Sequence, residues 1–234
     1  MYLWSNILKS NRGISSAFVR NLSLTTRVQT DRPKHKNPLM LMDLPRILVP
    51  PLFDLIKIRL KVLFRMRQID SSFSYSEFSK GSLQAIVTVS NMISKGDFDG
   101  IRDLVHDTAI EKVKKNYELL DSSQKSLISV NPNDVQVSVH YMFEEAKSDS
   151  SLFVKMGLLY YVVPGFYEAV QQTMTDPLKQ FEMRKKFQDD LIVVDYRFVR
   201  EYNEKAGPSE WLITELNHWA IADHEEEFKG RKPN

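Results

Sequence analysis

The sequence predicts an α+β protein in which N-terminal helices pack on one face of a curved antiparallel sheet. Two patterns carry this prediction. Apolar side chains recur at helical spacing through residues 74–120, whereas apolar and polar side chains alternate through residues 135–143 and 192–198. Helices that precede a run of strands in this way cover one face of an antiparallel sheet.

The length and composition indicate a single globular domain. The 234 residues are enough for one domain with a substantial core, and 42% of them are hydrophobic and 26% charged. The chain contains no cysteine. A disulfide framework, a thiolate nucleophile and a cysteine-ligated metal are therefore excluded.

The charge is distributed unevenly along the chain. Residues 1–36 hold seven Lys and Arg against Asp31 alone, a net charge of +6, while the whole chain has +2, so residues 37–234 sum to −4. The basic character therefore belongs to the N-terminal segment. The mildly acidic remainder argues against broad binding to nucleic acid.

Residues 1–36 have the features of a mitochondrial targeting segment. They are rich in Arg, Ser and Thr, nearly free of acid, and lack an apolar secretory core followed by a small-residue cleavage site. On a helix, Leu3, Trp4, Ile7 and Leu8 form an apolar stripe, and Arg20-Asn21-Leu22-Ser23 resembles a matrix-processing site. The alternative is a disordered basic arm.

Residues 37–69 combine a proline-broken linker with a basic amphipathic helix. Pro38, Pro45, Pro50 and Pro51 preclude one continuous helix up to residue 51. Leu52 to Gln68 then places its apolar side chains on one side of a helix (Leu52, Leu55, Ile56, Leu60, Leu63, Phe64) and most of its charges on the other.

This helix is our candidate for membrane contact. The apolar run is too short, and too interrupted by cations, to span a bilayer, but such a helix can lie on anionic lipid. The candidate contact residues are Lys57, Arg59, Lys61 and Arg65. Two alternatives stay open: a helix packed on its own domain with a solvated basic face, and an edge strand indicated by the alternation from Ile56 to Val62.

Three further helical segments are predicted. The strongest covers Ser74 to Ser94, with Ser74 or Ser76 as cap, and Lys95-Gly96 ends it. A short helix follows over Asp97 to Val105. Asp107 or Thr108 caps a third helix that extends to about Leu120, and a short turn is expected over Ser123 to Ser129.

The strand pattern begins at Val135. Val135 to Phe143 alternates as a strand with one solvent-exposed face, and Glu144 to Ser150 forms a polar turn. Leu152 to Val163 is apolar on both faces, which indicates either a central strand covered on both faces or a strand that bends. Within Phe166 to Lys186, Asp176-Pro177 marks a break, and Phe181 to Phe187 allows either a strand or a helix. A closing hairpin pairs Ile192 to Tyr202 with Trp211 to Leu216 across a Gly-Pro loop.

The order of these segments resembles a known family. A basic presequence precedes FSYSEFSKGSLQAIVTVSNMI, FDGIRDLV and the closing stretch DYRFVREYNEKAGPSEWLITELNHW. This succession is similar to the Tim forty-four-like domain over about residues 70–219. The domain is accordingly predicted over residues 70–220, followed by a charged tail over residues 221–234.

The resemblance implies a mitochondrial matrix protein, peripherally attached to the inner membrane, with the cone-shaped fold of nuclear-transport-factor-two-like proteins. Within the family, the chain looks most like relatives that bind the m-AAA protease and assist the maturation of imported inner-membrane proteins. The implied partners are m-AAA protease subunits and anionic inner-membrane lipid. The alternative is a mitoribosome receptor that contacts the large subunit.

The resemblance implies no catalytic residue, no cofactor and no small-molecule substrate. From the residues themselves, the chain has no Gly-rich phosphate loop, nucleophile elbow or His-Glu-x-x-His motif. His218, Asp223 and His224 could form a surface metal site, although exposed tail residues explain them equally well. His140 and Asp195, with Tyr160 or Tyr161 as proton donor, could act as catalytic groups, but a wet outer sheet face also accounts for them.

Overall fold

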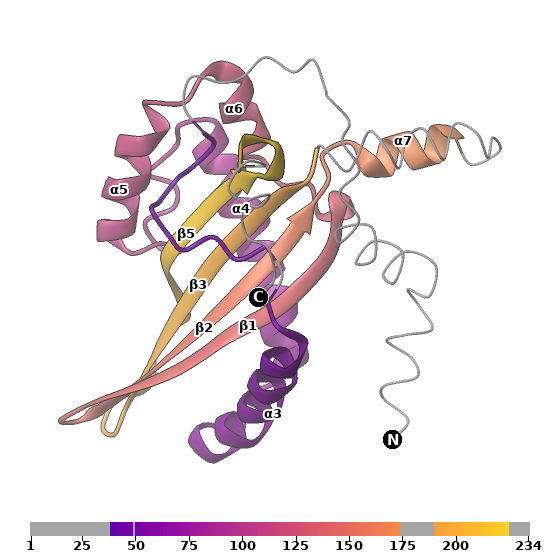
Figure 1. Ribbon diagram of the computed structural model, residues 1–234. Coiled ribbons are helices and arrows are strands. Elements are labelled where there is room, and N and C mark those ends of the chain that lie inside the picture. The colour runs from indigo at the N-terminus through magenta and orange to yellow at the C-terminus, as the bar shows by residue number, and fades with distance from the viewer. Residues whose placement is uncertain (1–37, 49, 174–189, 225–234) are drawn as a thin grey trace.

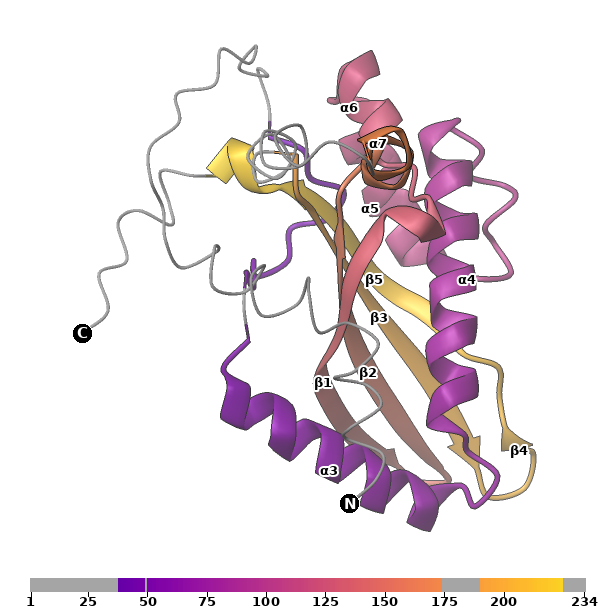
Figure 2. The same cartoon turned by 90° about the vertical axis from the view of Figure 1, so that its right-hand side faces the viewer.

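The computed structural model describes residues 38–48, 50–173 and 190–224 (Figure 1). The predicted targeting segment, residues 174–189 and the end of the charged tail lie outside the described residues. Helices α4, α5 and α6 cover one face of an antiparallel sheet, and the residues leading to α3 lie on the other side (Figure 2). The predicted α+β class is confirmed, whereas the finer cone-shaped fold stays a prediction.

The sheet is a meander of long strands. β1 (Val135–Ser148) pairs with β2 (Ser151–Val162), β2 pairs with β3 (Ile192–Asn203), and β3 pairs with β5 (Leu212–Ala220). The predicted turn over Glu144 to Ser150 is wrong, because Glu144 to Ser148 continue the ladder opposite Lys155 to Ser151. Alternation of charged side chains on an exposed strand end conceals such a continuation from a hydrophobicity pattern.

The closing hairpin is confirmed. Its loop contains Gly207 at φ 79°, a conformation that glycine adopts without strain. Gly207 and Pro208 form the two-residue strand β4, which pairs with the end of β3. β3 thus contacts β2 along one edge and both β5 and β4 along the other.

Three helices form the layer on the inner face of the sheet. α4 (Tyr75–Ser94) is capped by Ser74, whose Oγ accepts a hydrogen bond from Glu77 N at 3.3 Å, as predicted. α5 (Asp107–Tyr117) and α6 (Ser122–Leu127) also match their predictions, although the α5 cap is His106. Two short 3₁₀ turns span Pro132–Asp134 and Ile221–His224.

The helix predicted over Asp97 to Val105 is wrong. This connector forms turns, and the Asp97 carboxylate accepts a hydrogen bond from Gly100 N at 3.0 Å. A side chain that bonds to the backbone in this way competes with helix formation. The connector then pairs with the start of β5, where Ile213 N donates to Leu104 O and His106 N donates to Ile213 O.

The sheet has an apolar cluster on each face. On the inner face, Ile86 and Val89 of α4 are fully buried in the same cluster as Met156 and Leu158 of β2. The outer cluster contains Leu159, Tyr161, Val193 and Trp219, together with partly buried Ile47, Leu48 and Leu55. The prediction that both faces of β2 are covered is confirmed. At the centre of the sheet, the outer face is buried and not exposed to solvent.

The proline-broken segment before α3 packs on the sheet. Leu39 and Leu41 are fully buried, and Asn217 Oδ1 on β5 accepts hydrogen bonds from Leu41 N at 2.7 Å and Met42 N at 3.2 Å. Further along, Leu48 O accepts a hydrogen bond from Tyr161 Oη at 2.5 Å. The prediction of a linker is incomplete here, because hydrogen bonds from the backbone to Asn217 and from Tyr161 to the backbone hold these residues on the sheet as a covering segment.

The end of β2 leads into α7 (Phe166–Thr173). Asp134, which is 6% exposed, accepts hydrogen bonds from Gly165 N and Tyr167 N at 2.9 and 3.0 Å. The buried carboxylate therefore fixes where α7 starts. The choice between helix and strand over Phe181 to Phe187 falls outside the described residues.

Candidate membrane-facing surface

Helix α3 (Leu52–Ile69) carries the residues that sequence analysis selected for membrane contact. The predicted helix over Leu52 to Gln68 is confirmed, and the edge-strand alternative is wrong. Pro51 occupies the N-cap position, where its missing N–H costs nothing, and the helix ends before Asp70 in extended backbone. α3 crosses the β1 edge of the sheet, as Figure 2 shows.

One side of α3 packs on the protein. Val62 and Met66 are fully buried in the inner cluster, and Ile58 and Ile69 pack against it, while Leu55 joins the outer cluster. These positions recur every three or four residues and form one stripe. The apolar side predicted from the sequence includes only Leu55 of this set, so the buried side of α3 was not predicted.

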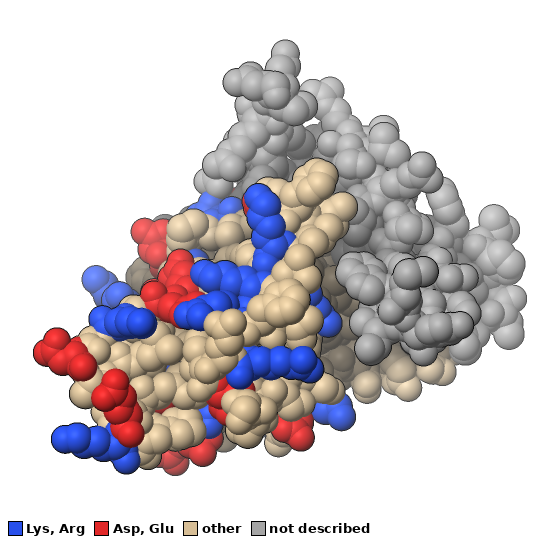
Figure 3. Space-filling view, turned by 90° about the horizontal axis from the view of Figure 1, so that it is seen from below, with Lys and Arg blue, Asp and Glu red and all other residues tan. Residues whose placement is uncertain are grey.

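The opposite side of α3 is apolar and faces solvent. Its six large side chains are between 42% and 78% exposed: Leu52, Phe53, Ile56, Leu60, Leu63 and Phe64. We call these six residues the outer stripe. A continuous set of exposed apolar side chains marks an interaction surface, whereas single exposed residues do not. Figure 3 shows this end of the molecule, where Lys and Arg side chains border uncharged surface.

The four predicted contact cations lie on the flanks of α3 and differ in their surroundings. The Lys57 side chain is 78% exposed and lies 3.6 Å from Asp54. The Arg59 guanidinium lies 4.1 Å from the centre of the Tyr75 ring. Lys61 Nζ donates to Phe143 O at 3.4 Å, and Arg65 donates to Glu145 through two nitrogens.

The structure therefore brings Arg59, Lys61 and Arg65 toward the domain and leaves Lys57 extended into solvent. The hydrogen bond from Arg65 lowers the pKa of Glu145 and correspondingly raises the pKa of Arg65. Arg67 was not among the predicted contact residues, but it is exposed one turn beyond Leu63 and therefore lies on the outer side. Its spacing from Ile56, Leu60 and Leu63 is the signal that could have identified it.

No helix in the described ranges is long enough and apolar enough to cross a membrane.

The candidate catalytic residues do not form one site. His140 pairs with Leu158 on the inner face, whereas Asp195 pairs with Leu159 on the outer face, so the sheet separates their side chains. His140 stacks on Phe78 at 5.6 Å between ring centres, and Tyr75 Oη lies 3.3 Å from its Nδ1. Burial lowers the pKa of His140 to about 4.

Asp195 belongs to a hydrogen-bonded group on the outer face. Tyr141 Oη donates to Asp195 Oδ1 at 2.7 Å and accepts from Arg197 Nε at 2.8 Å. Burial raises the pKa of Asp195 to about 6, although Arg197 and Tyr141 act in the opposite direction. Gly157 permits this arrangement, since a Cβ there would lie 2.8 Å from the Tyr141 ring.

The predicted proton donors have other partners. Tyr160 Oη bonds Ser82 Oγ at 2.9 Å on the inner face, and Tyr161 Oη donates to the backbone of the covering segment. His218 is fully buried beside Tyr196 Oη at 3.2 Å, while Asp223 accepts from Leu39 N. The surface metal site with His218, Asp223 and His224 is therefore wrong, as is the expectation that His218 is exposed.

Within the described residues, no group of three or more His, Asp or Glu side chains is placed to hold a metal ion. The outer stripe of α3 is an exposed apolar surface at the edge of the α+β domain. Such an arrangement defines a class of protein that binds another surface.

Comparison with known proteins gives a more particular result. No protein-family model matches the chain. The chain is 23% identical over 169 residues to m-AAA protease-interacting protein 1, mitochondrial, of Homo sapiens, a match that covers 70% of this chain and 57% of the human protein. The proteins of the same name from Rattus norvegicus and Mus musculus are each 24% identical over 155 residues, or 64% of this chain.

The match to the rat and mouse proteins covers 52% of their length, so this chain spans about half of the curated relatives that it matches. The predicted similarity to the m-AAA-protease-binding relatives is confirmed by this homology. The broader Tim forty-four-like assignment stays a prediction. The relatives are named as mitochondrial interacting proteins, in agreement with a mitochondrial adaptor.

Proposed function

We propose that this protein is a non-enzymatic mitochondrial adaptor that lies on the matrix side of the inner membrane and binds the m-AAA protease. In this role it assists the maturation of imported inner-membrane proteins. The outer stripe of α3 is the observation that carries membrane attachment. The homology to m-AAA protease-interacting protein 1 supports the choice of protein partner.

The outer stripe supplies enough apolar surface for reversible attachment. Complete removal of one large apolar side chain from water contributes about 1.5–3 kcal/mol. Each Lys or Arg close to an anionic membrane surface adds about 1 kcal/mol. Six partly exposed apolar side chains, with Lys57 beside them, therefore favour a helix that lies in the interface plane.

The packed side of α3 makes this attachment rigid. Val62 and Met66 anchor the helix in the core, so the outer stripe exists before any membrane is met. A preformed surface avoids the entropy cost of folding on binding. The domain is thus held at a fixed orientation, with its sheet and the α4–α6 layer available to a protein partner.

Vesicle binding tests the membrane part of the proposal. Leu60→Glu with Phe64→Glu places two charges in the outer stripe without disturbing a buried residue. Binding to phosphatidylcholine vesicles that contain cardiolipin is expected to fall by about tenfold or more, measured by co-sedimentation. Leu119→Glu with Tyr167→Glu is the matched control, because it adds the same two charges at side chains that are 61% and 45% exposed outside α3. Unchanged binding of the double variant would contradict membrane attachment through α3.

The protein partner is tested by affinity purification of the tagged full chain from gently solubilised mitochondria, with identification by mass spectrometry. Recovery of m-AAA protease subunits is the expected result. Recovery of large-subunit ribosomal proteins instead would favour the alternative, a mitoribosome receptor that aids insertion of inner-membrane proteins. The cations from Lys57 to Arg67 would then be the first residues to change.

A further inference from the structure

The first and last parts of the described chain bind each other. Leu39 N donates a hydrogen bond to Asp223 Oδ2 at 2.9 Å, although the two residues are 184 positions apart in the sequence. Asn217 Oδ1 on β5 accepts a further hydrogen bond from Leu41 N at 2.7 Å. The covering segment, residues 38–48, therefore closes onto the last strand of the described chain and onto the turn that follows it.

This contact lies in the core of the domain. Leu39 and Leu41 are fully buried and Met42 is 4% exposed, and all three belong to the inner cluster. Asn217 is itself only 1% exposed. Without the covering segment, the Asn217 amide would lose its backbone partners and the inner cluster would lose three large apolar side chains. Because both losses destabilise a folded domain, the covering segment is part of the core and not a detachable arm.

The covering segment also lies along the edge of β5. β5 pairs with β3 along its other edge, and at its start Ile213 exchanges backbone hydrogen bonds with the α4–α5 connector. Further along β5, Leu216 N donates to Met42 Sδ at 3.4 Å. An uncovered edge strand presents unpaired amide groups that can pair with another chain. The covering segment therefore protects this edge as well as filling the core.

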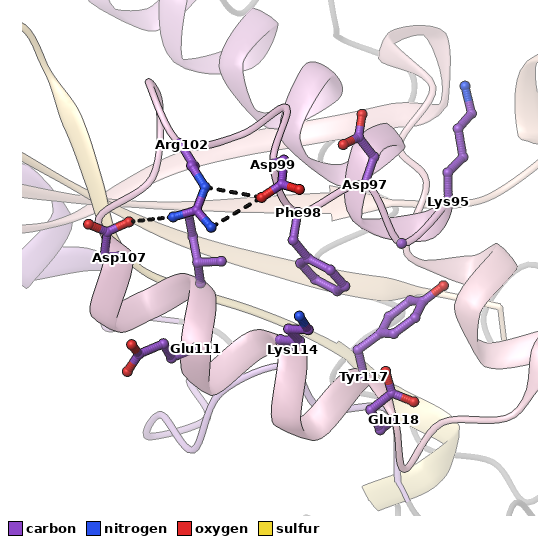
Figure 4. Close-up of a pocket in the computed structure, with 12 residues that line it drawn as sticks. Lys95, Asp97, Phe98, Asp99, Arg102, Asp107, Glu111, Lys114, Tyr117 and Glu118 are labelled. Atoms are coloured by element: carbon purple, nitrogen blue, oxygen red, sulfur yellow. Dashed lines mark hydrogen bonds and ion pairs between the residues drawn. The ribbon is translucent and has the colours of Figure 1, made fainter.

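The helical layer contributes another contact. Asn116 Nδ2 on α5 donates to Leu41 O at 2.9 Å. Figure 4 shows a different side of α5, where Glu111, Lys114 and Glu118 line a groove of about 710 Å³. Helical spacing places Asn116 on the side of α5 away from these three residues. The covering segment thus joins α5 to β5 without entering the groove.

These contacts place the start of the folded domain at Pro38 and not at residue 70. We propose that the mature protein keeps the covering segment, and that removal of the predicted targeting segment, residues 1–36, ends before Pro38. This inference rests on the proposed mitochondrial location, because a targeting segment is removed from an imported chain. The reaction is hydrolysis of one peptide bond by a processing peptidase. Water supplies the hydroxyl of the new carboxyl group and one hydrogen of the new amino group.

The limit at Pro38 has a physical reason before and after folding. In the folded domain, the amides of Leu39 and Leu41 are hydrogen-bonded and their side chains are buried, whereas a peptidase cleaves chain that is locally unfolded. A chain that is cut beyond Pro38 before it folds would lack the residues that complete the core. The processing site predicted at Arg20 to Ser23 satisfies this limit.

Limited trypsin digestion of the purified full chain tests whether the covering segment belongs to the folded domain. Cleavage after Lys36 is expected to be at least about tenfold faster than cleavage after Arg46, because cleavage within the covering segment requires local unfolding. Peptide masses followed over time give both rates. Equal rates, or a stable product that starts at Ile47, overturn the proposal.

A point variant tests the contact with β5. Asn217→Ala is expected to speed cleavage after Arg46 by about threefold to tenfold, the effect of losing a buried hydrogen-bond acceptor. Asn133→Ala is the matched control, because Asn133 is exposed. Cleavage after Lys80 on α4 reports unfolding of the whole domain, and an equal rise there would show that the covering segment opens only together with the domain, which also supports the proposal. An unchanged rate after Arg46 would contradict it.

The processing step is tested by terminal-peptide mass spectrometry of the protein, tagged at its C-terminus and purified from mitochondria. The first residue is expected within residues 21–38, between the predicted processing site and the covering segment. A first residue beyond Pro38, or a chain that still begins within residues 1–20, overturns the proposal. Absence of the protein from mitochondria would instead contradict the proposed function, on which the digestion of purified protein does not depend.

Discussion

Helices α3 and α4 follow one another in the chain, yet they present different surfaces to the solvent. α4 buries its large apolar residues, Ile86, Val89 and Ile93 among them, against the inner face of the sheet. α3 buries a narrow stripe and exposes six large apolar side chains on its other side. Packing within the domain explains why α4 has these apolar residues. The outer stripe of α3, in contrast, has no packing role within the described structure.

This difference separates residues that stabilise the fold from residues available for function. A buried apolar residue lowers the free energy of the folded state in proportion to the area that it removes from water. An exposed one contributes little to stability, and a set of six on one helix costs solubility. The proposed membrane contact gives such a set a function. Stability measurements can test directly whether the buried residues stabilise the fold and the outer stripe does not.

The largest effect is expected at the core. Ile86→Ala should lower the free energy of unfolding by about 2–5 kcal/mol, since the side chain is fully buried and its removal leaves a cavity. Leu60→Ala on the outer stripe should change it by no more than about 0.5 kcal/mol. Urea denaturation of both variants provides the measurement. A loss of several kcal/mol for Leu60→Ala would show that the outer stripe is covered within the folded protein.

Much of the fold could be predicted because it depends on local patterns. The start of α4 follows from Ser74, and the closing hairpin follows from alternation around Gly207. The packing of α3 was not predictable in the same way. Its sequence has apolar residues on two opposite sides, and only the position of β1 determines that Val62 and Met66 are buried while Leu60 and Phe64 are exposed.

The covering segment and the outer face of the sheet show a second reason why part of the structure could not be predicted from the sequence. Asn217 occurs in an ordinary strand pattern, and nothing in the sequence indicates that its side chain binds the backbone of Leu41 and Met42. The same segment leads into Leu48 and Leu55, which pack against the outer cluster. Asp195 is consequently buried, although its position in the alternation of apolar and polar residues along β3 predicts a solvent-exposed face.

A smaller effect on stability is expected when the pH is lowered, because of His140 at the junction between α3, α4 and β1. His140 has a pKa of about 4 in the folded protein because burial disfavours its charged form, compared with about 6.5 in the unfolded chain. The unfolded state therefore binds the proton first as the pH falls below about 6.5. The stability contributed by neutral His140 is fully present above that pH and is lost toward pH 4, by up to about 1.4 kcal/mol per pH unit.

His140→Phe should remove this contribution. Among the described residues its Nε2 has no hydrogen-bond partner, and Phe78 and Tyr75 lie against the ring, so an apolar ring is compatible with the site. The variant should be as stable as the parent near pH 7.5. Between pH 6.5 and 5 its free energy of unfolding should fall by less than that of the parent, as measured by urea denaturation at each pH. His218, with a pKa lowered to about 3 by burial, acts in the same direction in both proteins. An unchanged pH dependence would rule out His140 as a source of acid sensitivity.

The smallest effect is expected from the cations on the flank of α3. Arg65→Met removes a side chain paired with Glu145 and should lower the free energy of unfolding only slightly, because the pair is exposed to solvent. Lys57→Met should leave stability unchanged, because Lys57 is 78% exposed and its neighbour Asp54 lies at 3.6 Å on the helix surface. In vesicle binding we expect the reverse order, with about fivefold weaker binding for Lys57→Met and a smaller change for Arg65→Met.

The two substitutions remove the same charge and leave a similar side chain, so each serves as the control for the other. Arg65 points toward β1, on the packed side of the helix, whereas Lys57 lies nearer to the outer stripe. Charges beyond about 8–10 Å from a membrane surface are largely screened at physiological salt. If Arg65→Met weakened vesicle binding more than Lys57→Met, the membrane would have to meet the β1 side of α3, and the outer stripe would belong to a protein partner.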